Sequence, residues 1–263
     1  MPQAPRIQAR LFAHAFPSMT KIGFFSDVHG NLEALTAILK RLDQLSCDLL
    51  VCLGDIVGYG ANPSECIQII RERDIPCVMG NHDEYASSYM TPSVARLRPE
   101  ILQSIEWTQT QLSLEDRKWL AEQPMRLQLG EEIVALHSSF ARGKWAYCLD
   151  EDTFAANFEH QECPLAFCGH SHSPLIGIDM PGHAPFVDFI RPYTIPTDHR
   201  VMVNVGSVGQ PRDRDPRACA CLYEVEKRHL ELIREPYDIE TAQNKIYMAR
   251  LPDKFGLRLA IGR

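Results

Sequence analysis

The sequence lacks the features that would place the protein across a membrane or in an oxidising compartment. Its 263 residues contain no apolar run of about 18 residues, the length that a membrane-spanning helix needs. No Cys-x-x-Cys pair occurs, and the nine cysteines are odd in number and scattered through apolar segments. This distribution is typical of buried thiols in a reducing compartment, and it disfavours a disulfide framework or a zinc knuckle. We therefore expect a cytoplasmic protein with no membrane partner.

A basic surface is also missing. The formal net charge is -7, the isoelectric point is near 5.8, and no run of lysine or arginine appears. Nucleic-acid binders usually carry a basic face, so we do not expect nucleic acid as a partner. The net charge does not exclude a small anionic ligand, because bound divalent metal ions can make a site locally positive.

We do not expect the N-terminal segment to be a secretion signal. Residues 1–18 contain two arginines and scattered apolar residues, but no continuous apolar core. We interpret them as a flexible extension or a start-site artefact. No repeat, low-complexity tract or linker interrupts residues 19–263, whose composition is that of an ordinary globular protein. These residues are predicted to form a single domain.

Apolar patterns predict alternating strands and helices in the N-terminal part of the chain, an order typical of a parallel sheet with helical crossovers. A helical insert is predicted at about residues 84–123, where this rhythm is broken. The alternating elements are, in chain order, a strand at Lys21–Ser26, a helix at Asn31–Leu45, a strand at Asp48–Leu53, a helix from Pro63 to about Arg73 and a strand at Ile75–Met79.

The rest of the chain is predicted to be rich in strands, so mixed sheets with outer helices are the simplest architecture. The predicted strands lie at Arg126–Leu129, Glu132–His137, Leu165–Cys168, Leu175–Ile178, Phe186–Ile190, Val201–Val205, Ala218–Val225 and His229–Arg234, and the helices at Asp150–Gln161 and Tyr237–Ala249.

Five short polar sequences, each after an apolar run, are the most informative feature of the chain. Strands that end at one edge of a sheet would gather these polar side chains into one site. The one-residue gaps between Asp27 and His29 and between His170 and His172 fit an extended chain leaving a strand. Glycines before three of the polar residues permit sharp turns. The sequences are Asp27-Val28-His29, Gly54-Asp55, Gly80-Asn81-His82-Asp83, His137 and Gly169-His170-Ser171-His172.

The side chains in these sequences are metal ligands. Aspartate, asparagine and histidine suit manganese, iron, zinc, cobalt or nickel. Two such ions roughly 3.5–4 Å apart need a carboxylate to bridge them. A carboxylate presents two oxygens, whereas a neutral imidazole presents one lone pair. The ordered set therefore predicts a two-metal site, and such sites are suited to hydrolysis at phosphorus.

With this ordered set, the sequence resembles the calcineurin-like metallophosphoesterase superfamily over residues 19–263. It is most similar to the small bacterial and archaeal phosphodiesterase branch, and three stretches carry this similarity. The resemblance implies an α/β (α+β) fold, a four-layer αββα sandwich in which helices flank two mixed β-sheets. The three stretches are Gly54-Asp-Ile-Val-Gly-Tyr-Gly60, Asn204-Val-Gly-Ser-Val-Gly-Gln-Pro-Arg-Asp213, and Tyr237-Asp-Ile-Glu with the later Leu251-Pro.

The resemblance also implies a role for each polar side chain. A hydroxide bridging two divalent ions would attack a small phosphodiester or phosphomonoester. Manganese is the expected metal, with iron, zinc, nickel and cobalt as alternatives. His82 would bind no metal and would stabilise the transition state or protonate the leaving alkoxide. The first ion would be held by Asp27, His29 and His172, the second by Asn81, His137 and His170, and Asp55 would bridge them.

Two positions depart from the protein serine/threonine phosphatase branch. In that branch a second aspartate and an arginine follow the Gly-Asp sequence, whereas this chain has Gly58 and Tyr59. The aspartate would orient the catalytic histidine, and the arginine would hold phosphate. Their absence disfavours a phosphoprotein phosphatase and leaves the partner of His82 open. A non-catalytic scaffold of the same fold is a further alternative, disfavoured because His82 and all seven ligands are present.

Two further residues are candidates for substrate binding. Arg212 lies in a glycine-rich loop and could hold a phosphate with two hydrogen bonds, or it could brace the turn. Tyr59 could stack on a ring of the substrate, or it could pack in the core. Whether the protein forms a homo-oligomer is left open.

Overall fold

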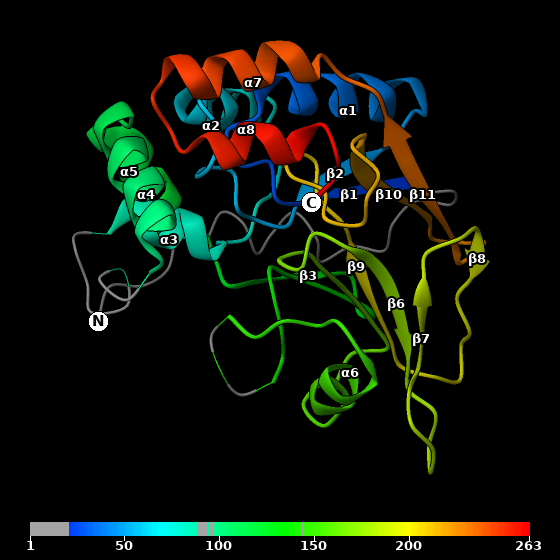
Figure 1. Ribbon diagram of the computed structural model, residues 1–263. Coiled ribbons are helices and arrows are strands. Elements are labelled where there is room, and N and C mark those ends of the chain that lie inside the picture. Colours follow the sequence, from blue (N-terminus) through cyan, green and yellow to red (C-terminus); the bar gives the residue numbers. More distant parts are fainter. Residues whose placement is uncertain (1–20, 89–93, 95–96, 142, 144) are drawn as a thin grey trace.

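Two β-sheets face each other, and helices cover their outer faces (Figure 1). The computed structural model describes residues 21–88, 94, 97–141, 143 and 145–263. The extension or start-site artefact predicted at residues 1–18 lies outside the described residues. The predictions of a single domain and of a helical insert stay predictions.

The first sheet has the order β2-β1-β10-β11-β8, and it mixes parallel and antiparallel neighbours. Its strands are β1 (Lys21–Phe25), β2 (Leu49–Cys52), β8 (Tyr193–Thr194), β10 (Ala218–Glu224) and β11 (His229–Glu235). The second sheet consists of β3 (Arg126–Leu129), β4 (Ile133–Leu136), β5 (Leu165–Cys168), β6 (Pro174–Ile178), β7 (Phe186–Phe189) and β9 (Val201–Val205). It is also mixed and has the order β3-β4-β5-β9-β6-β7.

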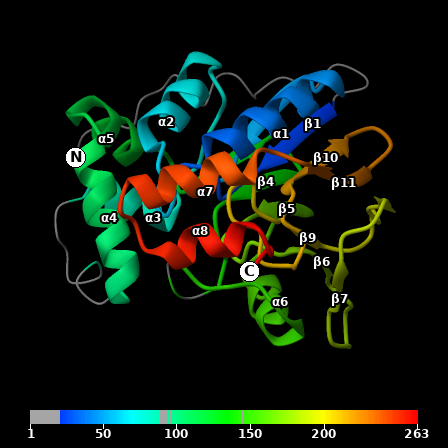
Figure 2. The same cartoon turned by 45° about the horizontal axis from the view of Figure 1, so that its top comes forward.

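The helices are α1 (Leu32–Gln44), α2 (Pro63–Glu72), α3 (Asn81–Ser87), α4 (Pro99–Gln111), α5 (Leu114–Ala121), α6 (Glu151–Phe158), α7 (Ile239–Met248) and α8 (Asp253–Leu259). Helices α1 and α2 pack on the outer face of the first sheet, and α7 and α8 lie beside them (Figure 2). Helix α6 covers the outer face of the second sheet. The predicted four-layer sandwich is confirmed.

The core between the sheets comes from alternate residues of each strand. In β1, Phe24 lies between the sheets, whereas Phe25 packs with α1 and α2 on the outer side. In β5, Phe167 faces inward and Cys168 faces α6. The rings of Phe24 and Phe167 stack across the two sheets with their centroids 3.8 Å apart. The two-residue period of each strand therefore joins all four layers.

The predicted third strand, Ile75–Met79, does not form. It is reduced to a single bridge between Cys52 and Cys77. Pro76 has no N–H to donate to a ladder, and the Met79 N–H donates to the Pro124 carbonyl oxygen instead, at 2.8 Å. Strand β8 and helix α8 were not predicted, because elements this short leave little periodic signal.

Helices α3, α4 and α5 lie together at one end of the molecule (Figure 1). They occupy much of the described part of residues 84–123. Within the described residues, no helix has the length and apolar character needed to cross a membrane. The nine cysteines are all free.

The stacked pair at the centre of the sandwich sets an expectation for stability. Phe24→Ala should lower the free energy of unfolding by about 3–5 kcal/mol, because it opens a cavity between the sheets. Leu257→Ala is the control, since Leu257 is 60% exposed on α8, and it should change the value by less than about 0.5 kcal/mol. Urea denaturation measures both. Equal effects of the two substitutions would contradict the proposed central role of the pair.

Candidate metal centre

The predicted ligands come together where strands of both sheets end. Asp27 follows β1, Asp55 follows β2, and His137 directly follows β4. His170 and His172 follow β5, and Asn81 is the first residue of α3. Strands β1 and β2 are parallel, as are β4 and β5, so each pair ends at one edge of its sheet. All seven side chains are buried, none more than 7% exposed.

The loops that carry five of these residues have left-handed backbone conformations. Their φ angles lie between 50° and 67°, so the prediction that an extended chain presents Asp27 and His29, and likewise His170 and His172, was wrong. Such conformations are unfavourable for residues other than glycine and concentrate at functional sites. Hydrogen bonds between the loops hold them, for example from the Asp27 N–H to the Gly54 carbonyl oxygen at 3.0 Å. The five residues are Asp27, His29, Asp55, His170 and His172.

The glycines before the ligands serve two different purposes. Gly54 has a φ of 88° and makes the turn that was predicted. Gly80 and Gly169 instead permit close approach of other groups. A Cβ on Gly80 would lie 2.1 Å from Oδ1 of Asp55, and one on Gly169 would lie 2.5 Å from Oδ2 of Asp27. The lack of a side chain lets the strand ends approach closely enough to share a site.

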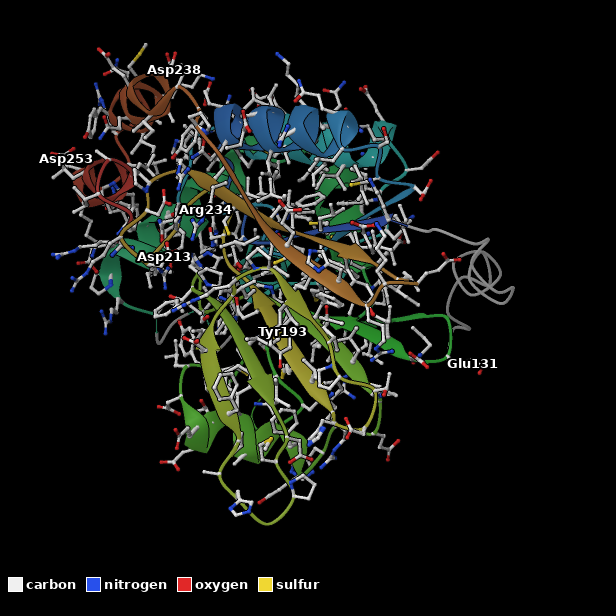
Figure 3. The ribbon with its side chains drawn as sticks, turned by 90° about the vertical axis from the view of Figure 1, so that its right-hand side faces the viewer. Glu131, Tyr193, Asp213, Arg234, Asp238 and Asp253 are labelled. Atoms are coloured by element: carbon white, nitrogen blue, oxygen red, sulfur yellow. The ribbon has the colours of Figure 1, made fainter. Side chains whose placement is uncertain are left out.

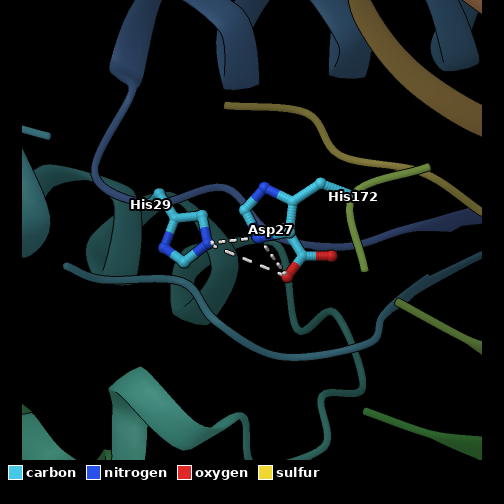
Figure 4. A group of neighbouring side chains, drawn as sticks. All are labelled: Asp27, His29 and His172. Atoms are coloured by element: carbon cyan, nitrogen blue, oxygen red, sulfur yellow. Dashed lines mark hydrogen bonds and ion pairs between the residues drawn. The ribbon is translucent and has the colours of Figure 1, made fainter. Parts of the chain in front are cut away.

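Asp27, His29 and His172 form the first ligand cluster (Figure 4). Oδ1 of Asp27 lies 3.3 Å from Nε2 of His172 and 3.8 Å from Nε2 of His29. The two Nε2 atoms are 3.1 Å apart. Three ligand atoms from two loops therefore point at one position.

The hydrogen bonds on the far side of each ring identify what the inward nitrogens are. Nδ1 of His29 lies 3.1 Å from the Val57 carbonyl oxygen, and Nδ1 of His172 lies 2.6 Å from that of Gln210. A carbonyl oxygen only accepts, so both Nδ1 atoms are protonated. Burial holds the pKa of each ring well below its usual value, so both rings are neutral. Each Nε2 is then unprotonated and presents a lone pair.

Two lone pairs 3.1 Å apart cannot hydrogen-bond to each other. Oδ1 of Asp27, which points at the same place, is buried and has no hydrogen-bond partner. A divalent cation would satisfy all three atoms at once, and aspartate with two imidazoles is a suitable donor set for a transition metal. The residues of the first cluster fit a metal ion.

Asp55, His137 and His170 form a second cluster, and Asn81 joins it. Nε2 of His137 lies 3.3 Å from Oδ2 of Asp55 and 3.2 Å from Oδ1 of Asn81. Nδ1 of His137 donates to the Leu53 carbonyl oxygen at 2.7 Å, which turns Nε2 inward. His170 uses its nitrogens the other way round: Nε2 donates to a carbonyl oxygen, that of Trp145, at 3.2 Å and leaves Nδ1 for the cluster.

The electrostatics of the second cluster also fit a cation. Burial alone would lower the pKa of His137, but the charge of Asp55 outweighs it and raises that pKa to about 10. The interaction is mutual, since burial would raise the pKa of Asp55 but the neighbouring histidines bring it below its usual value. The carboxylate thus attracts a positive charge to the inward nitrogen of His137. A bound metal ion replaces such a proton.

Asp55 lies between the two clusters. Its Oδ2 is 3.7 Å from Nε2 of His29 in the first cluster and 3.3 Å from Nε2 of His137 in the second. Its Oδ1 accepts a hydrogen bond from the backbone N–H of His82 at 2.7 Å. This is the position that a bridging carboxylate requires.

His82 lies at the same centre, from the first turn of α3. Its ring is packed against those of His29 and Tyr59, with centroids 4.9 and 4.4 Å away. Its Nδ1 is buried and has no hydrogen-bond partner among the described residues. A Cβ on Gly58 would meet this nitrogen at 2.4 Å. The chain therefore has a glycine against the atom that an aspartate would orient in the phosphatase branch.

Asp83 has a positioning role that sequence reasoning left unassigned. Its Oδ1 accepts hydrogen bonds from the N–H groups of Ile56 and Val57 at 2.8 and 3.2 Å. Its Oδ2 accepts from the Gly80 N–H at 3.1 Å. This buried carboxylate ties the loop that carries Asp55 to the start of α3. An acidic residue at the third position of a helix is the signal that could have revealed it.

The two tentative substrate residues lie beside the first cluster. The ring of Tyr59 packs edge-on against that of His29, at 4.7 Å, and it is only 7% exposed, so little of it is open to stacking. The backbone N–H of Arg212 donates to the carbonyl oxygen of His172 at 3.1 Å. On the other side of the centre, the half-exposed Tyr147, which sequence reasoning missed, stacks on His170 at 4.2 Å.

Comparison with known proteins identifies the family. Residues 20–228 match the model of the calcineurin-like phosphoesterase superfamily domain. An uncharacterized protein of Methanocaldococcus jannaschii is 32% identical over 255 residues, which cover 92% of this chain and 98% of that protein. The crystal structure of a metallophosphoesterase from Sphaerobacter thermophilus is 33% identical, with a TM-score of 0.79, and the match covers 94% of this chain and 100% of that one.

A hypothetical protein from Pyrococcus horikoshii shares the fold, with a TM-score of 0.77 at 19% identity, over 93% of this chain and 99% of its own. The family match covers every strand except β11 and both ligand clusters, and the resemblance seen in the sequence is confirmed. The chain belongs to the calcineurin-like phosphoesterase superfamily and is a phosphoric ester hydrolase.

Proposed function

We propose that the protein is a two-metal phosphodiesterase that acts on small phosphate esters, with manganese as the metal used. One observation carries the proposal. Four buried imidazoles each donate one ring N–H to a backbone carbonyl, so that the other nitrogens point at two adjacent positions with a carboxylate between them. Iron, zinc, nickel and cobalt accept the same donor set.

We assign each residue of the centre a role in binding metal or in catalysis. Asp27, His29 and His172 would hold one ion, Asn81, His137 and His170 the other, and Asp55 would bridge them. When bound, a pair of divalent ions supplies hydroxide near neutral pH and offsets charge on the phosphate oxygens. His82, which is left over, stabilises the negative charge of the transition state or protonates the leaving alkoxide.

The surroundings of His82 favour small esters over phosphoproteins. Gly58 leaves no carboxylate beside its Nδ1, and Tyr59 fills the place of the phosphate-holding arginine. A net charge of -7 disfavours nucleic acid as a substrate. We place the reaction in the cytoplasm, because nine free cysteines suit a reducing compartment.

Removal of the bridging carboxylate or of His82 tests the assignment. In the manganese-loaded protein, Asp55→Ala should abolish hydrolysis of bis(p-nitrophenyl) phosphate, and His82→Ala should lower kcat by about 10²–10⁴-fold. A panel of phosphate mono- and diesters measures activity and ranks substrates. The control is His183→Ala, an exposed histidine outside the centre, which should match the unmodified protein. Full activity in both variants would refute the proposed site.

Metal binding should also appear in stability. With manganese at about 100 times its Kd, the native state gains about 2.7 kcal/mol, or about 5–10 °C in Tm. Calorimetry with and without a chelator measures this shift. Asp27→Ala should reduce the shift because it removes a ligand of the first ion, whereas His183→Ala should retain it. A shift that is the same in Asp27→Ala would show that manganese binds elsewhere.

A further inference from the structure

Two arginines converge on one buried amide beside the metal centre. Oε1 of Gln210 accepts hydrogen bonds from Nη2 of Arg212 at 2.8 Å and from Nη1 of Arg258 at 3.1 Å. Gln210 is 2% exposed, and its backbone oxygen accepts from Nδ1 of His172. One residue thus links a metal-ligand candidate to two cations. Arg258 lies on α8, the helix that was not predicted.

No acidic side chain among the described residues forms an ion pair with either arginine. The acid next to Arg212 in sequence, Asp213, pairs with Arg234 instead (Figure 3). Nε of Arg212 is buried and has no hydrogen-bond partner in the described part of the chain. Burial lowers the pKa of Arg258, and the charge of Arg212 lowers it further.

This arrangement is unfavourable without a negatively charged ligand. Two like charges held on one neutral oxygen repel each other, and a buried N–H without an acceptor loses its hydrogen bond to water. An anion against the two guanidinium groups would remove both penalties. Arginine is suited to this because its planar fork matches the oxygens of phosphate and carboxylate. A phosphate monoester, with two negative charges, balances the pair better than a carboxylate does.

The pair lies on the side of the first cluster. The backbone N–H of Arg212 donates to the carbonyl oxygen of His172 at 3.1 Å, and the backbone oxygen of Gln210 accepts from Nδ1 of the same residue. The ester being cleaved does not need this added charge. Two divalent ions, when bound, would be balanced by the carboxylates of Asp27 and Asp55 together with one hydroxide and a diester anion. The positive charge of the arginines is left for another group of the substrate.

We propose that Arg212 and Arg258 form one binding site for a second phosphate group of the substrate, separate from the phosphate that is cleaved. The preferred substrates are then phosphodiesters that carry an additional phosphate monoester. This inference rests on the proposed phosphodiesterase function. Arg258 is a specificity-determining residue, and the Gln210 side chain positions it.

A matched pair of chromogenic esters tests the inference. One is the p-nitrophenyl ester of thymidine 5′-phosphate, and the other is the same ester with a 3′-phosphate added. The manganese-loaded protein should prefer the 3′-phosphorylated ester by about 10–100-fold in kcat/KM, the value of a charged hydrogen bond to phosphate. Arg258→Gln should remove most of this preference, because the substitution should lower kcat/KM for the 3′-phosphorylated ester more than for the plain one.

Two further variants separate charge from folding. Arg258→Lys keeps the positive charge without the fork and should retain part of the preference. Lys254→Gln removes a positive charge from the same helix, but Lys254 pairs with Glu100 and not with Gln210, so the preference should stay unchanged. Binding of thymidine 3′,5′-bisphosphate and thymidine 5′-phosphate, measured by calorimetry, should show the same pattern without turnover.

The outcomes distinguish this inference from the proposed function. If neither ester is hydrolysed, the proposed function fails, and the binding comparison alone decides the inference. If both esters are hydrolysed equally well, or if Arg258→Gln slows both by the same factor, the second-phosphate site is refuted while the phosphodiesterase stands. The site is also refuted if the unmodified protein binds thymidine 3′,5′-bisphosphate no more tightly than thymidine 5′-phosphate, or if Arg258→Gln shows the same difference in affinity as the unmodified protein.

Discussion

The hydrogen bond from one ring nitrogen of a buried histidine to a backbone carbonyl is the interaction on which the centre depends. His29, His137 and His172 donate through Nδ1 to the carbonyl oxygens of Val57, Leu53 and Gln210, in that order. His170 donates through Nε2 to the carbonyl oxygen of Trp145. Each bond fixes which nitrogen is protonated, and so which one presents a lone pair. Without these four carbonyls the same histidines would be free to rotate or to change tautomer, and no common focus would exist.

Two of the four carbonyls, those of Leu53 and Val57, belong to the loop of Asp55, one of the loops whose ligand residues are left-handed. Each of these conformations is unfavourable on its own, and it persists only because the surrounding structure determines it. The two sheets supply that constraint. Phe24 and Phe167 stack just before the loops of Asp27 and His170 begin, so the packing at the sandwich centre fixes the strand ends. Stability of the core and geometry of the site are therefore connected through the sheets.

Six of the seven candidate ligands follow a strand whose apolar pattern is strong, so the sequence could indicate where they meet, whereas Asn81 follows a segment that forms only a single bridge. The conformation of the loops was harder to predict. An Asp-x-His spacing is compatible with an extended chain and with two left-handed residues, and only the hydrogen bonds between loops decide between them. The role of Gly80 was missed for the same reason, since the carboxylate that excludes a side chain there belongs to Asp55.

Arg258 shows the limit of local patterns most clearly. It contacts Gln210 across 48 positions of sequence, from a seven-residue helix with little periodic signal. Tyr59 connects the metal centre with α8. Its ring packs against that of His82 on one side and, with centroids 4.8 Å apart, against that of Phe255 on the other.

In the phosphatase branch an arginine stands where this chain has Tyr59. Here the aromatic ring occupies that place and packs against α8, the helix from which Arg258 reaches Gln210. The loop after Asp55 therefore places an aromatic ring, and no arginine, between His82 and α8. The two guanidinium groups meet at Gln210, whose backbone oxygen holds His172, and this place beside the metal centre suits the second anionic group that we propose.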